Sequence, residues 1–274
     1  MVTGTSTGGI IALGLASGLS AHEILDFYLE HGPGVFCGPK LPRKLRQWAL
    51  GKYDAGGLSG ALDRVFGDRR LGESMTRVVI PAVNLETGEV HVYKTSHHPK
   101  FERDYRQRVV DVAMATAAAP TYFPTHLSQT GIPLIDGGVF ANNPSGLAAV
   151  ESIGILGWQR GDFAILSLGC GDEPLAVGRG RHRNLGRLYW ASKLADVFMA
   201  AQSSSSMGTA YLLAGHDNVR RVSPRVAPGR FGLDVTKEIP ALHGLGDSEA
   251  RKALPGLRTM FFDAKADPFT PYRE

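Results

Sequence analysis

The fold is decided by the opening stretch Met1-Val2-Thr3-Gly4-Thr5-Ser6-Thr7-Gly8-Gly9, which contains a G-x-S-x-G pentapeptide. An apolar segment typical of a helix follows it directly. Where a strand turns sharply into a helix, side chains two positions before and two positions after the turn residue have no room, so glycines are expected there. Gly4 and Gly8 meet this need around Ser6. The stretch therefore predicts a strand, a tight turn that presents a serine hydroxyl, and a helix.

Ser6 at such a turn has the surroundings of a nucleophile. Its hydroxyl stands at the N-terminus of a helix, where the Thr7 N–H and the positive end of the helix dipole stabilise an oxyanion. A glycine- and threonine-rich turn without chemistry is the other interpretation, and the pentapeptide alone does not separate the two. A phosphate-binding P-loop fits less well, because it needs Lys and then Ser or Thr after its last glycine, whereas Ile10 follows Gly9.

A second informative stretch is Leu134-Ile135-Asp136-Gly137-Gly138-Val139-Phe140-Ala141-Asn142-Asn143-Pro144. It carries an acid from the end of a short apolar run into a Gly137-Gly138 turn and the start of a helix. A carboxylate beside Ser6 takes the Oγ proton as a general base where desolvation keeps it basic. An aspartate that caps its own turn through bonds to backbone N–H groups is the alternative.

Together with two further stretches, these residues resemble the patatin-like phospholipase family of acyl hydrolases. The further stretches are Ala117-Ala118-Ala119-Pro120-Thr121-Tyr122-Phe123-Pro124 and Ile165-Leu166-Ser167-Leu168-Gly169-Cys170-Gly171. The resemblance implies an α/β fold with three α/β/α layers and a mainly parallel or mixed central sheet. It also implies a catalytic dyad without metal or organic cofactor, in which Ser6 is the nucleophile of an acyl-enzyme and Asp136 is the base, with the Thr7 N–H in the oxyanion hole.

One departure from the family matters for activity. Its members carry an Asp-Gly-Gly-Gly-x-Arg-Gly type loop upstream of the serine turn, which supplies further oxyanion donors, and this chain starts only a few residues before Gly4. We therefore expect a single hydrolase domain over residues 1–274 that lacks the first strand and this loop. Removing one oxyanion donor costs about 100- to 1000-fold in rate. A catalytically silent interaction or regulatory module is thus an alternative to an enzyme.

A soluble carboxylesterase with a Ser-Asp-His triad is the other alternative. In the order serine, acid, histidine, the histidine candidates are His182, His216 and His243. None lies in a motif that matches a triad: the first is in an arginine-rich segment, the second precedes an aspartate in an expected turn, and the third lies in a stretch flanked by glycines.

Composition and charge narrow the class of protein further. With 274 residues, 43% of them hydrophobic, the chain is able to bury a large core. Cys37 and Cys170 have no C-x-x-C spacing, so we expect neither a disulfide framework nor a zinc site, and cytoplasmic residence fits. No stretch is long and apolar enough to span a bilayer.

Positive charge gathers in two clusters. The first combines basic residues with apolar ones and suits an anionic lipid surface, with Trp48 at the interface, although a solvated helix face is the alternative; its basic residues are Lys40, Arg43, Lys44, Arg46 and Lys52. The second fits phosphate or nucleotide binding or a solvated loop, and comprises Arg179, Arg181, His182, Arg183 and Arg187. Neither has the signature of a nucleic-acid-binding protein.

The tail is compatible with bacterial phospholipase effectors that cyclic nucleotides switch on during phage defence. This resemblance implies a membrane phospholipid substrate, a cyclic-nucleotide activator and a peripheral location at the inner face of the membrane. It leaves the oligomeric state open.

The remaining pattern alternates helices with strands. Ser20 and Glu23 predict a capping box at the start of the second helix. His97 and His98 are expected to be a surface pair, because adjacent side chains in a strand point to opposite faces. We expect residues 162–168 to be a strand buried on both faces. The other expected elements are helices over 10–16, 21–31, 58–66, 109–119, 189–214 and 241–257, a hairpin of 77–84 with 89–95, and a last strand over 219–222.

Overall fold

The structure, a computed structural model, describes residues 1–36, 51–174, 185–232 and 234–273. Most of the first basic cluster lies outside these ranges, including Trp48. Residues 179–183 of the second cluster, with His182, lie outside them as well. The expectations attached to these residues therefore stay predictions.

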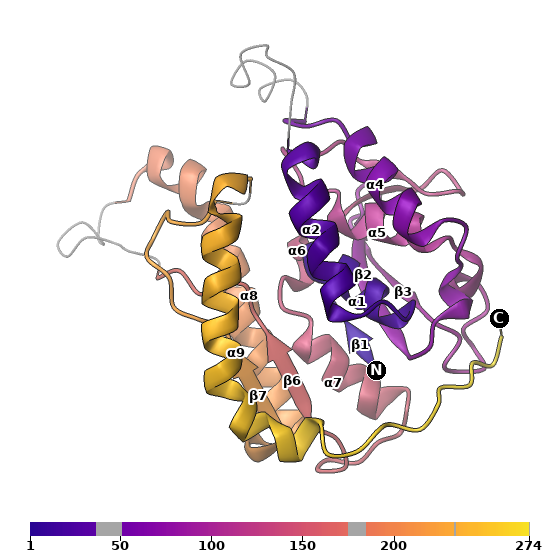
Figure 1. Ribbon diagram of the computed structural model, residues 1–274. Coiled ribbons are helices and arrows are strands. Elements are labelled where there is room, and N and C mark those ends of the chain that lie inside the picture. The colour runs from indigo at the N-terminus through magenta and orange to yellow at the C-terminus, as the bar shows by residue number, and fades with distance from the viewer. Residues whose placement is uncertain (37–50, 175–184, 233, 274) are drawn as a thin grey trace.

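The described chain alternates strands and helices, as the sequence predicts (Figure 1). Its elements are β1 (Val2–Thr3), α1 (Thr7–Ala16), α2 (Ala21–Val35), α4 (Gly56–Phe66), β2 (Val78–Asn84), β3 (Val90–Lys94), α5 (Val109–Ala117), β4 (His126–Leu127), β5 (Pro133–Asp136), α6 (Gly138–Ala141), α7 (Ser145–Gly154), β6 (Ile165–Leu168), α8 (Arg187–Ala214), β7 (Val219–Val222) and α9 (Ile239–Phe261).

The described strands form a mixed sheet of five strands and a separate parallel pair. In the five-stranded sheet the order is β1-β2-β5-β4, and β3 also pairs with β2. β1 is parallel to β2, whereas β3 and β5 are antiparallel to β2, and β4 is antiparallel to β5. β6 and β7 pair in parallel. The expected α/β fold with a mixed sheet is thus confirmed.

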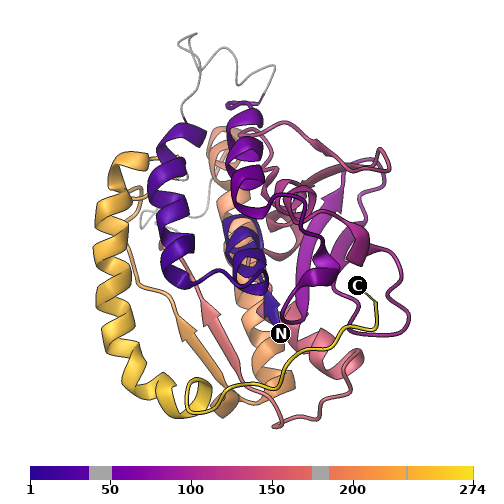
Figure 2. The ribbon, with the colours of Figure 1, turned by 45° about the vertical axis from the view of Figure 1, so that its right-hand side comes forward.

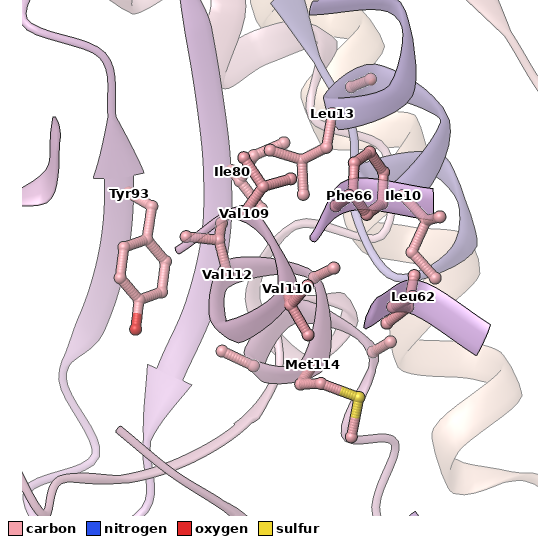
Figure 3. Close-up of a cluster of buried hydrophobic side chains, with 14 of the residues drawn as sticks. Ile10, Leu13, Leu62, Phe66, Ile80, Tyr93, Val109, Val110, Val112 and Met114 are labelled. Atoms are coloured by element: carbon pink, nitrogen blue, oxygen red, sulfur yellow. The ribbon is translucent and has the colours of Figure 1, made fainter. Parts of the chain in front are cut away.

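β2 is the centre of the larger sheet and is buried on both faces from Val78 to Val83. Its residues Val78, Ile80 and Ala82 belong to a core that α1, α4 and α5 complete, and Figure 3 shows Leu13 of α1 and Val109 of α5 next to Ile80. α6 contacts β2 as well. Helices thus pack against a sheet whose central strand is buried on both faces, as in α/β folds.

A second, smaller core joins the β6–β7 pair to two helices. It contains Ala149 of α7, Ala210 and Ala214 of α8, Phe163, and Val219 of β7. In both views α8 and α9 lie on the side of the molecule that carries β6 and β7 (Figures 1 and 2). α7 contacts β1 as well as β6 and α8, so it connects the two parts.

Most expected elements are confirmed. The hairpin, the last strand and the helices recur with ends shifted by up to a few residues, and the Ser20–Glu23 capping box forms at the start of α2. α5 ends at Ala117 rather than Ala119, because Ala118 leaves the helical conformation and its carbonyl accepts the Asp136 N–H.

Two expectations are wrong. The strand expected over residues 162–168 covers only Ile165–Leu168, and Leu168 is 70% exposed, because β6 pairs only with β7 among the described strands. His97 is buried rather than at the surface, because its Nε2 lies 3.0 Å from an oxygen of the buried Glu151 of α7. Lys94 Nζ lies 2.7 Å from the other oxygen of that carboxylate.

None of the helices described here combines the length and the apolar character needed to cross a membrane.

Candidate active site

The two stretches singled out in the sequence meet along one edge of β2. β3 pairs with one edge of β2 over residues 79–83. β1 and β5 pair with residues of β2 that fall partly within this range, so both must use the other edge of β2. β1 ends at Thr3, opposite Val79, and β5 runs antiparallel and ends at Asp136, opposite Ala82. The carboxyl ends of the two strands therefore point at each other with only two residues of β2 between them.

Ser6 occupies the sharp turn between β1 and α1. Its backbone has φ 57° and ψ −126°, a positive φ that non-glycine residues rarely adopt and that costs about 1–3 kcal/mol. The Ser6 N–H donates to Thr116 Oγ1 at 3.2 Å, and Thr116 donates in turn to the carbonyl of Pro81 at 2.7 Å. This buried threonine of α5 thus ties the strained turn to the central strand.

The glycines around Ser6 have different roles in packing. A Cβ on Gly4 would lie 1.9 Å from the Gly8 carbonyl oxygen, so only glycine fits there. A Cβ on Gly9 would lie 2.7 Å from Thr116 Cγ2. A Cβ on Gly8 would meet no described atom within 4 Å, so local packing does not by itself require glycine at this position, contrary to the expectation from the pentapeptide.

Thr7 is the first residue of α1 and directly follows Ser6. The first N–H groups of a helix have no acceptor within the helix, and the helix dipole adds positive potential at this end. The Thr7 N–H therefore lies at this end of α1, and its role as an oxyanion donor stays a prediction.

Asp136 stands at the end of β5, beside Ser6. Its side chain is 5% exposed, and burial raises its pKa to about 6, against hydrogen bonds from the Ser6 side chain and the Gly138 N–H that lower it. The Gly138 N–H donates to Asp136 Oδ1 at 2.7 Å. The carboxylate thus caps its own turn and contacts the serine at the same time, so the two interpretations of Asp136 are compatible.

Gly137 and the short helix α6 lock this turn onto the sheet and onto the serine turn. A Cβ on Gly137 would lie 2.1 Å from the Pro81 carbonyl oxygen, so this glycine lets the turn approach β2. At the end of α6, the buried Thr5 Oγ1 donates to the Ala141 carbonyl at 2.6 Å. The two loops that carry Ser6 and Asp136 are therefore directly hydrogen-bonded to each other.

An apolar cavity of about 220 Å³ opens beside the Asp136 loop. Ala118, whose carbonyl holds the Asp136 N–H, is part of its wall. The other lining residues come from α4 and the residue before it, from α5, β4 and the segment between α5 and β4, and are Ala55, Leu58, Met114, Ala117, Phe123, Pro124, Thr125, His126 and Leu127. The Ala117–Pro124 stretch of the sequence thus builds one side of a cavity next to the candidate base.

The structure gives no histidine to the pair of Ser6 and Asp136 within the residues it describes. His216 follows α8 and stacks on Tyr211, with ring centroids 4.6 Å apart. His243 is exposed on α9. In residues 1–36, 51–174, 185–232 and 234–273 no histidine hydrogen-bonds Asp136, and no group of side chains suited to a metal ion is present.

Ser6 and Asp136 are candidates from the sequence alone, whereas the residues that hold them are not. Thr116 carries the clearest signal, because it is the one hydroxyl in the otherwise apolar and alanine-rich stretch Val112–Ala119. Thr5 stands inside the pentapeptide without an assigned role. The serine run Ser203–Ser206 was visible, but nothing in the sequence places it near Asp136.

The chain matches a known protein family. A family profile described as patatin-like phospholipase matches residues 1–149, more than half of the chain. The chain belongs to the patatin-like phospholipase family. The match includes both the turn at Ser6 and the Asp136 loop. Patatin-like phospholipases are hydrolases that act on ester bonds.

Named members of this family include close bacterial relatives. A cGAMP-activated phospholipase of Pseudomonas aeruginosa (strain BWHPSA011 / Pa011) is 38% identical over 210 residues, which are 75% of this chain and 62% of the relative. A cGAMP-activated phospholipase of Vibrio cholerae is 41% identical over 154 residues, 53% of this chain and 43% of the relative. Patatin-like protein 2 of rice is 30% identical over 212 residues, 63% of this chain and 51% of the relative. The chain thus spans less than two thirds of each.

Proposed function

We propose that this member of the family is a lipid acyl hydrolase that cleaves ester bonds of membrane phospholipids through a Ser6–Asp136 dyad. The observation that carries the proposal is the contact of a strained, partly exposed serine at a helix N-terminus with a buried aspartate whose pKa is raised to about 6. A carboxylate with this pKa is mainly ionised at pH 7 and is a better proton acceptor than an ordinary aspartate.

The reaction follows from these positions in two halves. Ser6 Oγ attacks the ester carbonyl carbon while its proton passes to Asp136, and the oxyanion lies by the Thr7 N–H. The tetrahedral adduct then expels the alcohol, which takes the proton from Asp136 and leaves an acyl group on Ser6. Water attacks this acyl-enzyme, again with Asp136 as base, and releases the fatty acid and the free serine.

The apolar cavity next to Ala118 supports an acyl chain as the group that enters the site. Apolar side chains dominate its lining, which favours hydrocarbon over a polar headgroup. Exposed apolar side chains near the site support peripheral contact with the bilayer that holds the substrate: Val139 and Phe140 follow Asp136 on α6, and Phe198 on α8 is 64% exposed. The basic cluster with Trp48 lies outside the described residues, and its role in this contact is part of the proposal.

The names of the bacterial relatives support two further parts of the proposal. Because the Pseudomonas and Vibrio proteins are called cGAMP-activated phospholipases, we propose a cyclic nucleotide as the activator and anti-phage defence as the context. We also propose that residues 1–274 act as one hydrolase domain. A catalytically silent interaction module is the competing outcome.

Reaction with a fluorophosphonate probe tests the dyad without a membrane. Ser6 Oγ forms a bond to phosphorus, fluoride leaves, and the serine proton passes to Asp136. We expect mass spectrometry to locate the adduct on Ser6 and the rate to be half-maximal near pH 6. In Asp136→Asn the rate falls by at least about 100-fold, in line with general-base catalysis. Equal labelling rates in the parent and Asp136→Asn would exclude the dyad, and no labelling of the folded parent would favour the silent module.

A further inference from the structure

The run Ser203-Ser204-Ser205-Ser206 lies in the middle of α8, where serine is a poor helix former. Neither the dyad nor the cavity uses these residues. In the structure this part of α8 lies against the segment that follows Asp136, and three of its side chains bond to that segment: Gln202, Ser203 and Ser206. Ser203 and Ser206 are thus explained by what they contact rather than by the helix that contains them.

Gln202 binds the backbone of α6 and of the residue that follows it. Its Nε2 donates to the Val139 carbonyl at 2.9 Å, and its Oε1 accepts the Asn142 N–H at 2.9 Å. α6 has only four residues, so most of its N–H and carbonyl groups have no partner inside the helix. One amide side chain therefore supplies the donor and the acceptor that this short helix needs.

Ser206 binds the next part of the same segment. Its Oγ donates to the Asn143 carbonyl at 2.5 Å and accepts the Gly146 N–H at 2.8 Å. A Cβ on Gly146 would lie 2.9 Å from the Ser206 carbonyl oxygen, so α7 and α8 approach backbone to backbone here. Asn143 Nδ2 also donates to Ser203 Oγ at 3.3 Å. The contact between α8 and this segment is therefore close and specific.

α6 is in turn bonded to both catalytic loops. Gly138, its first residue, donates its N–H to Asp136, and Ala141, its last residue, accepts the Thr5 hydroxyl. Any shift of α6 away from α8 moves the Gly138 donor and the Asp136 carboxylate relative to Ser6. We propose that Gln202 and Ser206 are positioning residues that hold the Asp136 loop at the distance from Ser6 that proton transfer requires. This rests on the proposed role of Asp136 as the base.

Three variants and a matched control test the proposal. Gln202→Met keeps the length of the side chain and removes both bonds to α6, and Ser206→Ala removes both bonds to the Asn143–Gly146 segment. Gln202→Glu keeps an acceptor for the Asn142 N–H and loses the donor. Ser204→Ala is the control, because this exposed serine lies on the same helix and has no side-chain hydrogen bond among the described residues.

The kinetic measurement is hydrolysis of p-nitrophenyl butyrate as a function of pH. We expect kcat to fall about 10- to 100-fold in Gln202→Met and Ser206→Ala with KM within about twofold, because a shift of about 1 Å in a catalytic group has this size of effect. Gln202→Glu falls between these variants and the parent, and Ser204→Ala equals the parent. Unchanged kcat in Gln202→Met, or a loss that only follows the folded fraction measured by circular dichroism, would overturn the proposal.

A ¹³C NMR titration of the Asp136 carboxyl group gives an answer even if the parent hydrolyses nothing. In the parent we expect a pKa near 6, and in Gln202→Met a changed pKa, because a displaced loop alters both the burial of the carboxylate and its hydrogen bond from Ser6. An identical titration in both would overturn the positioning role. Failure of the proposed function gives a different result. The pKa of Asp136 would then still be near 6 in the parent and would still change in Gln202→Met, but Asp136→Asn would hydrolyse the ester as fast as the parent.

Discussion

The sheet that carries Ser6 and Asp136 and the part built from β6, β7, α8 and α9 are packed very differently. Around β2 a large core is closed on both faces of the strand, and residues such as Leu13 and Leu134 are completely buried. The β6–β7 part has a small core, and its strand β6 ends in the exposed Leu168. The first part therefore holds the candidate residues Ser6 and Asp136 by close packing, whereas the second contacts the candidate site through polar side chains of α8.

The largest effect is expected from a substitution of Gly4, in the part built around β2. In Gly4→Ala the new Cβ would overlap the Gly8 carbonyl, so the turn at Ser6 must open or the protein must fail to fold. We expect loss of esterase activity and a fall of several kcal/mol in the free energy of unfolding, on the order of the largest single-mutation effects. Gly8→Ala is the matched control and should keep the fold in urea unfolding experiments. Equal stability of Gly4→Ala and the parent would contradict this packing.

A leucine in each part measures the difference between the two cores. Leu13→Ala removes a fully buried side chain of α1 and should lower the free energy of unfolding by about 2–5 kcal/mol. Leu168→Ala changes a side chain that is 70% exposed and should alter it by no more than about 0.5 kcal/mol. Urea unfolding of both variants makes the comparison, and similar losses would mean that Leu168 is covered in solution.

Asp136, the candidate base, is expected to lower the free energy of unfolding at neutral pH. Because the pKa of Asp136 is about 6 when folded and near 3.8 when unfolded, the folded state binds more protons between these values and loses stability as the pH rises through that range. Asp136→Asn should therefore unfold with a free energy higher by about 2–3 kcal/mol at pH 7 and with no such gain at pH 3.5. If Asp136→Asn were less stable than the parent at pH 7, the site would stabilise the ionised carboxylate of Asp136 instead of destabilising it.

A small stabilising effect is expected in α8. A Cβ on Gly208 would meet no described atom within 4 Å, and glycine inside a helix costs about 1 kcal/mol relative to alanine. Gly208→Ala should therefore stabilise the protein by about that amount, opposite in sign to Gly4→Ala. Thermal melts of Gly4→Ala, Gly208→Ala and the parent give the sign of each change in melting temperature. Destabilisation by Gly208→Ala would mean that a side chain at this position of α8 meets neighbouring atoms.

The sequence predicts well those features that depend on residues close together in the chain. The turn at Ser6, the capping box at Ser20 and the hairpin of β2 and β3 follow from glycines, caps and alternation within a few residues. The end of α5 and the length of β6 were misjudged, because Ala118 is recruited by Asp136 and β6 has only β7 as a described partner. Both depend on contacts far apart in the sequence.

The residues of the candidate site also differ in how far the sequence predicts them. The sequence indicates Ser6 and Asp136 as candidates because each lies in a glycine-rich motif with chemical meaning. Their supports were not found, because Thr116, 110 residues from Ser6, and Gln202, 60 residues from Asn142, become neighbours only after folding. The buried His97 shows the same limit: adjacent histidines indicate a surface pair until Glu151 on another helix supplies a partner.

Release of fatty acid from mixed phospholipid vesicles tests the central claim most directly. The parent is measured beside Ser6→Ala and Asp136→Asn at equal folded content, with and without cGAMP. We predict release by the parent and its loss, by at least about 1000-fold, in both variants. Release by Ser6→Ala at the rate of the parent, or by Asp136→Asn at that rate, would contradict the dyad.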